Sequence, residues 1–338
     1  MESNVPPQHL IFGRLQRMYL LPPNKRPQLD VPGGNLLYAG GGLALWDKGI
    51  GLVARVGEDY PRVWIDQYKQ RGFDVRGIRI LPKAMGLRHF LAYTDLYTRY
   101  TDNPIAHFAR RKLPFPKSLF GYRDTSNQVD SRTHLTEYSV RQSDLPPEFM
   151  HATGAHFCPL DYLSHSLMPA VLRQAGFTTL TLDPGKSYMN PAFWDHVPSI
   201  TTGLTAFLPS EEKVLSLFHG HSSDLWEIAE ALASYGCEII VIKRAIQGQL
   251  LYDAAAKTRW EIPAYPSREA NLTGAGDAFC GGFIAGYRRT YDPLEATLYG
   301  NVSASLAIEG SGPFYILDTL PGLPEARLRV LRQSVRKV

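Results

Sequence analysis

From about residue 152 onward, short β-rich runs alternate with segments of helical periodicity. The strand-like runs include residues 178–183 and 238–242, and the helix-like segments include 164–175 and 224–235, each of which ends before a glycine. Consecutive strand-helix-strand units build a parallel sheet with helices on both faces. The pattern therefore predicts an α/β fold in which ligands bind beyond the carboxyl ends of the strands.

The first third of the chain follows the same alternation with interruptions. Residues 51–56 are expected to form a strand and residues 62–70 a helix. Residues 10–31 and 87–100 have strand-like patterns outside this rhythm, and we expect them to lie outside the helix-covered sheet. Residues 102–147 are rich in Pro, Ser, Arg and Lys, which predicts a long connection or excursion; a functional lid and a mobile segment explain it equally well.

Composition limits the class of protein. At 338 residues the chain fits one large α/β domain with an insertion, and we expect a single domain over residues 1–338. A net charge of +4 is small for a nucleic-acid partner, although it is compatible with an anionic substrate. The sequence has neither a secretory signal pattern nor an apolar run that could span a bilayer, so we expect a cytoplasmic protein with no membrane partner. Three distant cysteines are expected to be buried, without a disulfide or metal: Cys158, Cys237 and Cys280.

Residues 271–279 (NLTGAGDAF) form a glycine-bearing turn that leads directly into an apolar helix. Gly274 and Gly276 let the backbone bend and direct successive N–H groups to one point, where the helix end also attracts anions. A carboxylate at Asp277 would repel a resting phosphate, so its useful task is to accept the proton of an attacking hydroxyl. The turn therefore indicates phosphoryl transfer; taken alone, it is also compatible with a tight turn capped by an aspartate.

The helix after the turn places Phe279, Phe283 and Tyr287 on one face, which would bury it against the sheet. Turn and helix together resemble the C-terminal signature of the ribokinase-like (PfkB) carbohydrate kinase family, Asp-x-Thr-Gly-Ala-Gly-Asp-x-Phe. Residues 31–35 (VPGGN) and 55–59 (RVGED) are similar to the family's N-terminal signature. The resemblance covers almost the whole chain. It implies a three-layer α/β/α fold with a central, mostly parallel sheet and a small β lid formed by the strands outside the rhythm.

The resemblance also implies roles for individual residues. Asp277 would be the general base, and the anion hole would come from the backbone of Gly274, Ala275 and Gly276. ATP would be the phosphate donor, with Mg²⁺ bridging its phosphates. The nucleotide side would be lined by Lys243, Gly248, Thr273 and Asn301, and the acceptor side by Gly33, Gly34, Asn35 and Tyr38.

Simpler interpretations remain open for parts of this set. Lys243 is equally consistent with a surface lysine at a strand end, and Asn301 alone with a helix cap. Glu212 is expected as a metal ligand, but a charged helix N-terminus explains Glu211 and Glu212 equally well.

Several positions depart from the family's pattern. Met18 stands where the family has an acceptor-binding aspartate, and Tyr38 where it has an asparagine, so a standard sugar pocket is put in doubt. Tyr38 also adds an aromatic face that could stack on a ring. The family's Asn-x-x-Glu motif corresponds to Ser210 and Lys213. Further replacements are Asn271 for an aspartate and Ala245 for a glycine.

Together these features predict an ATP-dependent kinase for a hydroxyl of a small sugar-like molecule. A nucleoside or other ring-bearing acceptor is the alternative within the same fold, and a weakly catalytic nucleotide- or metabolite-binding regulator is the alternative outside enzymes. Strands of a lid can also pair between subunits, so a homodimer is compatible with the sequence.

Overall fold

The computed structural model describes residues 6–23, 26–124 and 128–338 of the chain. Its larger sheet has ten strands in the order β14-β13-β12-β11-β10-β9-β8-β1-β4-β5. All neighbours from β5 to β11 are parallel, and β12, β13 and β14 extend the sheet as antiparallel strands. The strands are β1 (His9–Phe12), β4 (Ile50–Gly57), β5 (Phe73–Leu81), β8 (Gly154–Phe157), β9 (Thr179–Leu182), β10 (Ala206–Phe207), β11 (Ile239–Lys243), β12 (Gln249–Asp253), β13 (Thr258–Ile262) and β14 (Arg336–Lys337).

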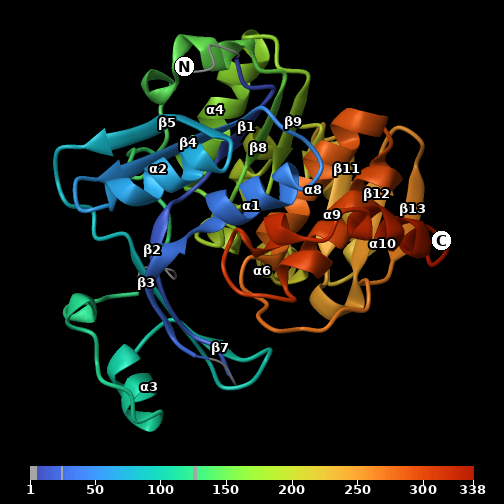
Figure 1. Cartoon of the computed structure of the whole chain (residues 1–338). Coiled ribbons are helices and arrows are strands. Elements are labelled where there is room, and N and C mark those ends of the chain that lie inside the picture. Colours follow the sequence, from blue (N-terminus) through green and yellow to red (C-terminus); the bar gives the residue numbers. More distant parts are fainter. Residues whose placement is uncertain (1–5, 24–25, 125–127) are drawn as a thin grey trace.

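Helices cover both faces of this sheet (Figure 1). One face packs against α4 (Tyr162–Gln174), α5 (Pro198–Thr201), α6 (Glu211–Leu217) and α7 (Leu225–Ser234). The other packs against α1 (Asn35–Ala44), α2 (Arg62–Gln70), α8 (Ala275–Thr290), α9 (Pro293–Ala307) and α10 (Leu323–Arg332). Side chains alternate between these layers along β1, since Leu10 and Phe12 join the first core and Ile11 joins the second. The predicted three-layer α/β/α fold is confirmed.

The segments predicted from periodicity lie where expected. The strands at 178–183 and 238–242 are β9 and β11, and the helices at 164–175 and 224–235 are α4 and α7, each within two residues at either end. Residues 62–70 form α2 with the bounds expected. Short 3₁₀ turns fill several connections: η1 (Lys117–Leu119), η2 (Gln142–Asp144), η3 (Pro147–His151), η4 (Pro191–His196), η5 (Ala245–Gln247) and η6 (Tyr315–Asp318).

Glycines allow α1 and α8 to touch backbone to backbone. A Cβ added to Gly42 would lie 2.1 Å from the carbonyl oxygen of Ala278, and one added to Gly281 would lie 1.9 Å from that of Ala39. No larger residue fits without separating the two helices. The contact fixes the amino-terminal end of α8, which carries the glycine turn, relative to α1.

A second sheet lies apart from the first, in the order β3-β2-β6-β7 (Figure 1). Its strands are β2 (Gln16–Leu21), β3 (Gln28–Gly33), β6 (Arg88–Tyr93) and β7 (Arg99–Tyr100). The sequence prediction of strands outside the main sheet was wrong for residues 10–12. They belong to β1 in the centre of the large sheet, because their side chains are buried between its two helical layers.

The segment at 102–147 contains one α-helix, α3 (Pro104–Arg110), within its described residues. Phe108 and Leu119 pack into one buried cluster with Tyr19, Leu21 and Phe90 of the second sheet. This part of the segment is therefore a packed cover for one face of that sheet. The opposite face carries a separate cluster: Met18, Leu20, Leu91, Tyr93 and the partly buried Val31.

In the described ranges, no helix combines the length and the apolar character that crossing a bilayer requires.

Candidate active site

The glycine turn begins α8 at the carboxyl edge of the parallel strands. Gly274 precedes the helix with a φ of 79°, a conformation that favours glycine. Among the described residues, the backbone N–H groups of Gly274, Gly276 and Asp277 donate to no chain acceptor, whereas that of Ala275 donates to the Leu272 carbonyl at 3.3 Å. The sequence predicted an anion hole from the backbone of Gly274, Ala275 and Gly276; in the structure the N–H group of Asp277 is free in place of that of Ala275. Free N–H groups at a helix start form a site for an anion.

Asp277 lies in the first turn of α8 and is half-buried. Within the described part of the chain its carboxylate makes no hydrogen bond or ion pair. Burial raises its pKa to about 6, and the charge of Asp183 adds to the increase, while Lys243 and Lys213 oppose it. A carboxylate with this pKa is ionised at neutral pH and is more basic than an ordinary aspartate. It is therefore suited to accept a proton.

Three charged side chains meet next to this turn. Asp183 follows β9 and is 3% exposed; its two carboxylate oxygens each accept from one lysine, Lys213 and Lys243, both at 2.6 Å. Burial alone would raise the pKa of Asp183, but the two lysines hold it below its usual value. Burial alone would lower the pKa of Lys243, but Asp183 raises it overall. Lys243 also donates to the carbonyl of Gly276 at 3.4 Å. Its ammonium group therefore lies against the glycine turn at residues 271–279, called the anion turn below.

The N-terminal Gly-Gly turn joins β3 to α1. Gly34 has a φ of 105°, and a Cβ there would lie 2.1 Å from the carbonyl oxygen of Arg14. Asn35 accepts from the Arg14 N–H at 2.7 Å and donates to the Pro159 carbonyl at 2.8 Å. Its side chain therefore ties the chain after β1 to the chain after β8. A role for Asn35 in acceptor binding stays a prediction, and the contacts observed are structural.

Tyr38 lies on α1 directly under the anion turn. Only 5% of the residue is exposed, and a Cβ added to Gly274 would lie 2.1 Å from its Cδ1 atom. Burial and the charge of Asp277 raise the pKa of its hydroxyl. The ring face that could stack on an acceptor is thus partly covered by Gly274. Tyr38 supports the turn, and the closeness of its ring explains why position 274 accepts only glycine.

Tyr93 of the second sheet contacts the glycine turn, and Tyr97 in the loop between β6 and β7 contacts the segment just before it. The hydroxyl groups of Tyr93 and Thr273 lie 2.9 Å apart, and the hydroxyl of Tyr97 donates to the carboxylate of Glu269 at 2.8 Å. At the other end of the sheet, a Cβ on Gly33 would lie 2.1 Å from Cγ of Met18. The apolar face of the second sheet therefore extends between the two signature turns.

The remaining nucleotide-side predictions have structural partners. Gly248 lies between β11 and β12 with a φ of 85°, where a Cβ would meet the Ile262 carbonyl oxygen at 1.9 Å. Asn301 is 3% exposed; it accepts from Tyr265 N–H at 3.0 Å and donates to the Pro263 carbonyl at 2.8 Å. Its amide holds the loop after β13, so a direct nucleotide contact by this side chain stays a prediction.

The predicted metal ligand, Glu212, lies at the surface. The Glu212 side chain is 65% exposed and forms an ion pair with Lys186 at 3.0 Å. No cluster of three or more His, Cys, Asp or Glu side chains that could hold a metal ion exists among the described residues. Free N–H groups and lysines fit the phosphates of a nucleotide well. Glu212 as a metal ligand stays a prediction, and Mg²⁺ at this site would be held largely through phosphate oxygens.

Sequence reasoning missed three contributions to this site. Asp183 was noted only within residues 181–184, which resemble the family's strand end that often faces the phosphates, and Lys213 only as a departure from the family. Their ion pair joins segments 30 residues apart and has no local signal. Tyr93 was not singled out. The carboxyl end of β9 was the available signal for Asp183, because ligands bind at this edge of a parallel sheet.

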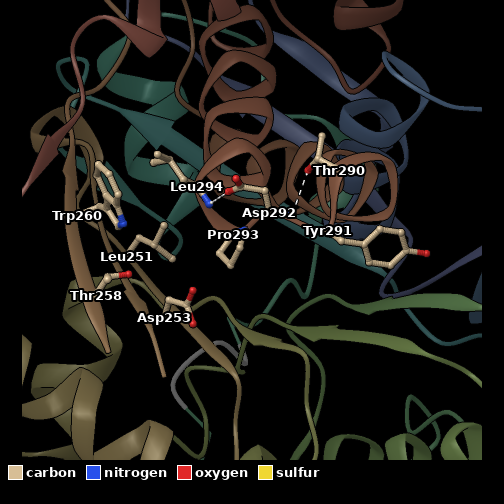
Figure 2. A pocket seen from close by; sticks show the side chains of 9 residues that line it. All are labelled: Leu251, Asp253, Thr258, Trp260, Thr290, Tyr291, Asp292, Pro293 and Leu294. Carbon is tan, nitrogen blue, oxygen red and sulfur yellow. Dashed lines mark hydrogen bonds between the residues drawn. The ribbon is translucent and has the colours of Figure 1, made fainter. Parts of the chain in front are cut away.

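A separate hollow of about 420 Å³ lies between the end of α8 and the hairpin of β12 and β13 (Figure 2). Its lining includes Asp253, Trp260 and Tyr291. Because α8 ends there and carries Asp277 in its first turn, the hollow lies at the other end of this helix from the charged cluster. It does not belong to the candidate active site.

Comparison with known proteins identifies the family. A family model for pfkB family carbohydrate kinases matches residues 151–320, half of the chain. The chain belongs to the PfkB family of carbohydrate kinases. This PfkB kinase is 24% identical to a cytidine kinase of Thermococcus kodakarensis over 288 residues, which cover 85% of this chain and 90% of that relative.

Solved structures agree with the family in fold. An E. coli protein assigned as a ribokinase II, solved in complex with ATP and Mg²⁺, superposes with a TM-score of 0.68 at 19% identity and covers 96% of this chain and 99% of its own. A nucleoside kinase of Burkholderia thailandensis in complex with inosine gives 0.65 at 18% identity, covering 96% and 98%. The PfkB kinase described here therefore has the ribokinase-like fold, as the sequence predicted.

Proposed function

We propose that this PfkB kinase transfers the γ-phosphate of ATP to a hydroxyl of a small sugar-like acceptor, with Asp277 as general base. The observation that carries the proposal is the half-buried Asp277 carboxylate, which has no partner among the described residues. It lies in the first turn of α8, beside free backbone N–H groups. The Asp277 carboxylate could accept the proton of the acceptor hydroxyl, while the neighbouring N–H groups stabilise the negative charge of the phosphate.

The transfer uses these groups in one concerted arrangement. The acceptor oxygen bonds to the γ-phosphorus as the bond from that phosphorus to the bridging oxygen of ADP breaks, and the hydroxyl proton passes to Asp277. The N–H groups of Gly274, Gly276 and Asp277 would stabilise charge on the transferred group. Mg²⁺ bound to the nucleotide would neutralise part of the phosphate charge. Lys243 would hold the phosphates against the turn.

We also propose that the described elements form a single kinase domain with the second sheet as its lid. Its apolar face lies between the two signature turns, and Tyr93 contacts the anion turn directly. A lid in this position excludes water and limits wasteful hydrolysis of ATP. A homodimer through the edge strands β3 and β7 stays a prediction.

A nucleoside is the second candidate acceptor. The apolar cluster of the lid, with Met18, Leu91 and Tyr93, suits the base of a nucleoside better than the hydroxyls of a free sugar. The similarity to a cytidine kinase and to a nucleoside kinase supports the same choice.

An acceptor panel tests the proposal. Purified protein with ATP and Mg²⁺ would be offered ribose, fructose, cytidine and inosine, and ADP formation measured for each. Turnover with one class and not the other identifies the acceptor. If ATP binds but none of these or related acceptors is phosphorylated, the proposal fails and a regulatory protein on this fold is favoured.

A further inference from the structure

Two lysines share one buried carboxylate beside the anion turn. Asp183 directly follows β9, Lys243 is the last residue of β11, and Lys213 lies on α6, the helix that follows the intervening strand β10. Both ammonium groups lie 2.6 Å from Asp183 oxygens, so they are close to each other as well. The carboxyl edge of such a sheet is where ligands bind.

The two lysines of this group have only one directly paired carboxylate. One carboxylate neutralises only one of the two ammonium groups, while the side chains of Lys213 and Lys243 are only 15% and 10% exposed. Both lysines are close enough to Asp277 to oppose the rise of its pKa, yet in the described chain its carboxylate forms no ion pair with either of them. Largely buried charges are costly unless they are paired. The two ammonium groups thus share one directly paired carboxylate, and an anion from outside the chain would give them a second partner.

The surroundings show where that anion would lie. Lys243 contacts the carbonyl of Gly276, so the lysine pair borders the free N–H groups of the turn. A nearby lysine differs: Lys186 is 61% exposed and is neutralised by Glu212 at 3.0 Å. Lys186 thus has a carboxylate of its own, whereas Lys213 and Lys243 share one.

We propose that Lys213 is a second phosphate-binding ammonium group of this site, which contacts the transferable end of a nucleotide together with Lys243, and that Asp183 holds both lysines in position. The inference rests on the proposed phosphotransferase function. The family has a glutamate at the position of Lys213, so the sequence alone does not predict a phosphate-binding cation there.

Ligand binding tests the role of Lys213 without requiring turnover. Titration calorimetry would measure ADP with Mg²⁺, and separately inorganic pyrophosphate, on the wild type and on Lys213→Met, Lys213→Arg and Lys186→Met. Hydrogen bonds to charged groups predict that Lys213→Met weakens both ligands by about tenfold to about a hundredfold. Lys213→Arg is expected to retain most of the affinity, because it keeps the charge and the donors. Lys186→Met is the matched control and should change affinity less than about twofold.

Thermal unfolding separates this role from a structural one. If Lys213 only supports Asp183, Lys213→Met lowers the melting temperature of the free protein but leaves ligand affinity unchanged, and the proposal is overturned. If it binds phosphate, the stabilisation by saturating pyrophosphate shrinks in the variant. Loss of affinity in Lys213→Met, in a protein that phosphorylates no acceptor, would support Lys213 and refute the proposed function. Failure of the wild type to bind both ADP and pyrophosphate would overturn both.

Discussion

Replacing Asp277 by asparagine should make the protein more stable at neutral pH while removing its base. The folded protein raises the pKa of Asp277 from 3.8 to about 6, which means that folding favours the protonated carboxyl. Its stability contribution is therefore complete below pH 4 and is lost as the pH rises through about 6. Asparagine is neutral at every pH and does not suffer this loss.

The size of the effect follows from the shift in pKa. A pKa change of one unit corresponds to about 1.4 kcal/mol, so the shift of Asp277 sets an upper limit of about 3 kcal/mol. Solvent at the half-buried side chain screens part of this, and we expect Asp277→Asn to gain about 1 to 3 kcal/mol above pH 7. Little or no gain is expected at pH 3.5, where the carboxyl is mostly neutral in both the folded and the unfolded wild type.

Urea unfolding at pH 3.5, 5 and 7.5 measures this gain directly. Asp277→Glu serves as a control that keeps an ionisable group in the same turn. An unchanged or lower stability of Asp277→Asn at pH 7.5 would show that burial and the charge of Asp183 do not destabilise the ionised form of Asp277. An equal gain at all three pH values would show that ionisation is not its cause.

Three further outcomes are expected. The kcat/KM of the wild type should fall about tenfold per pH unit below about pH 6, because Asp277 must be ionised to accept a proton; a flat profile between pH 5 and 8 would argue against this base. Tyr93→Phe should raise the KM for the acceptor about fivefold, because it removes the hydrogen bond between the lid and Thr273. Tyr97→Phe, at an exposed site, should raise this KM less, and equal effects of the two variants would contradict a special role of Tyr93 in holding the lid. Gly281→Ala should destabilise the protein by about 1 to 3 kcal/mol in urea unfolding, because its Cβ would meet the Ala39 carbonyl, whereas the exposed Gln70→Ala should stay within about 0.5 kcal/mol.

Local sequence patterns predicted much of the fold because its elements bury regular apolar faces. The helix at 62–70 and the strands at 178–183 and 238–242 depend on periodicity alone, and the structure contains them. The assignment of residues 10–12 failed because a short buried strand has the same pattern in either sheet. The packing of residues 104–122 over the second sheet depends on contacts with distant strands, which no local pattern encodes.

The site divides in the same way. Gly274 and Asp277 were recognisable because a turn, a helix start and a carboxylate occur within four residues. The pairing of Asp183 with Lys213 and Lys243 was not, because ion pairs across three strands depend on strand order. Arg327 on α10 shows the same limit: it is 8% exposed and binds the Glu309 carboxylate with two hydrogen bonds, a contact that no local pattern encodes.

Single-turnover transfer of labelled phosphate from [γ-³²P]ATP to the acceptor, by wild type and by Asp277→Asn, tests the central claim most directly. Both proteins would first be shown to bind ATP with similar affinity. We expect label in the acceptor with the wild type and transfer slowed by a factor of about 10² to 10⁴ in the variant, the range for loss of a general base. Transfer at the wild-type rate by Asp277→Asn would contradict the assignment of Asp277 as the base.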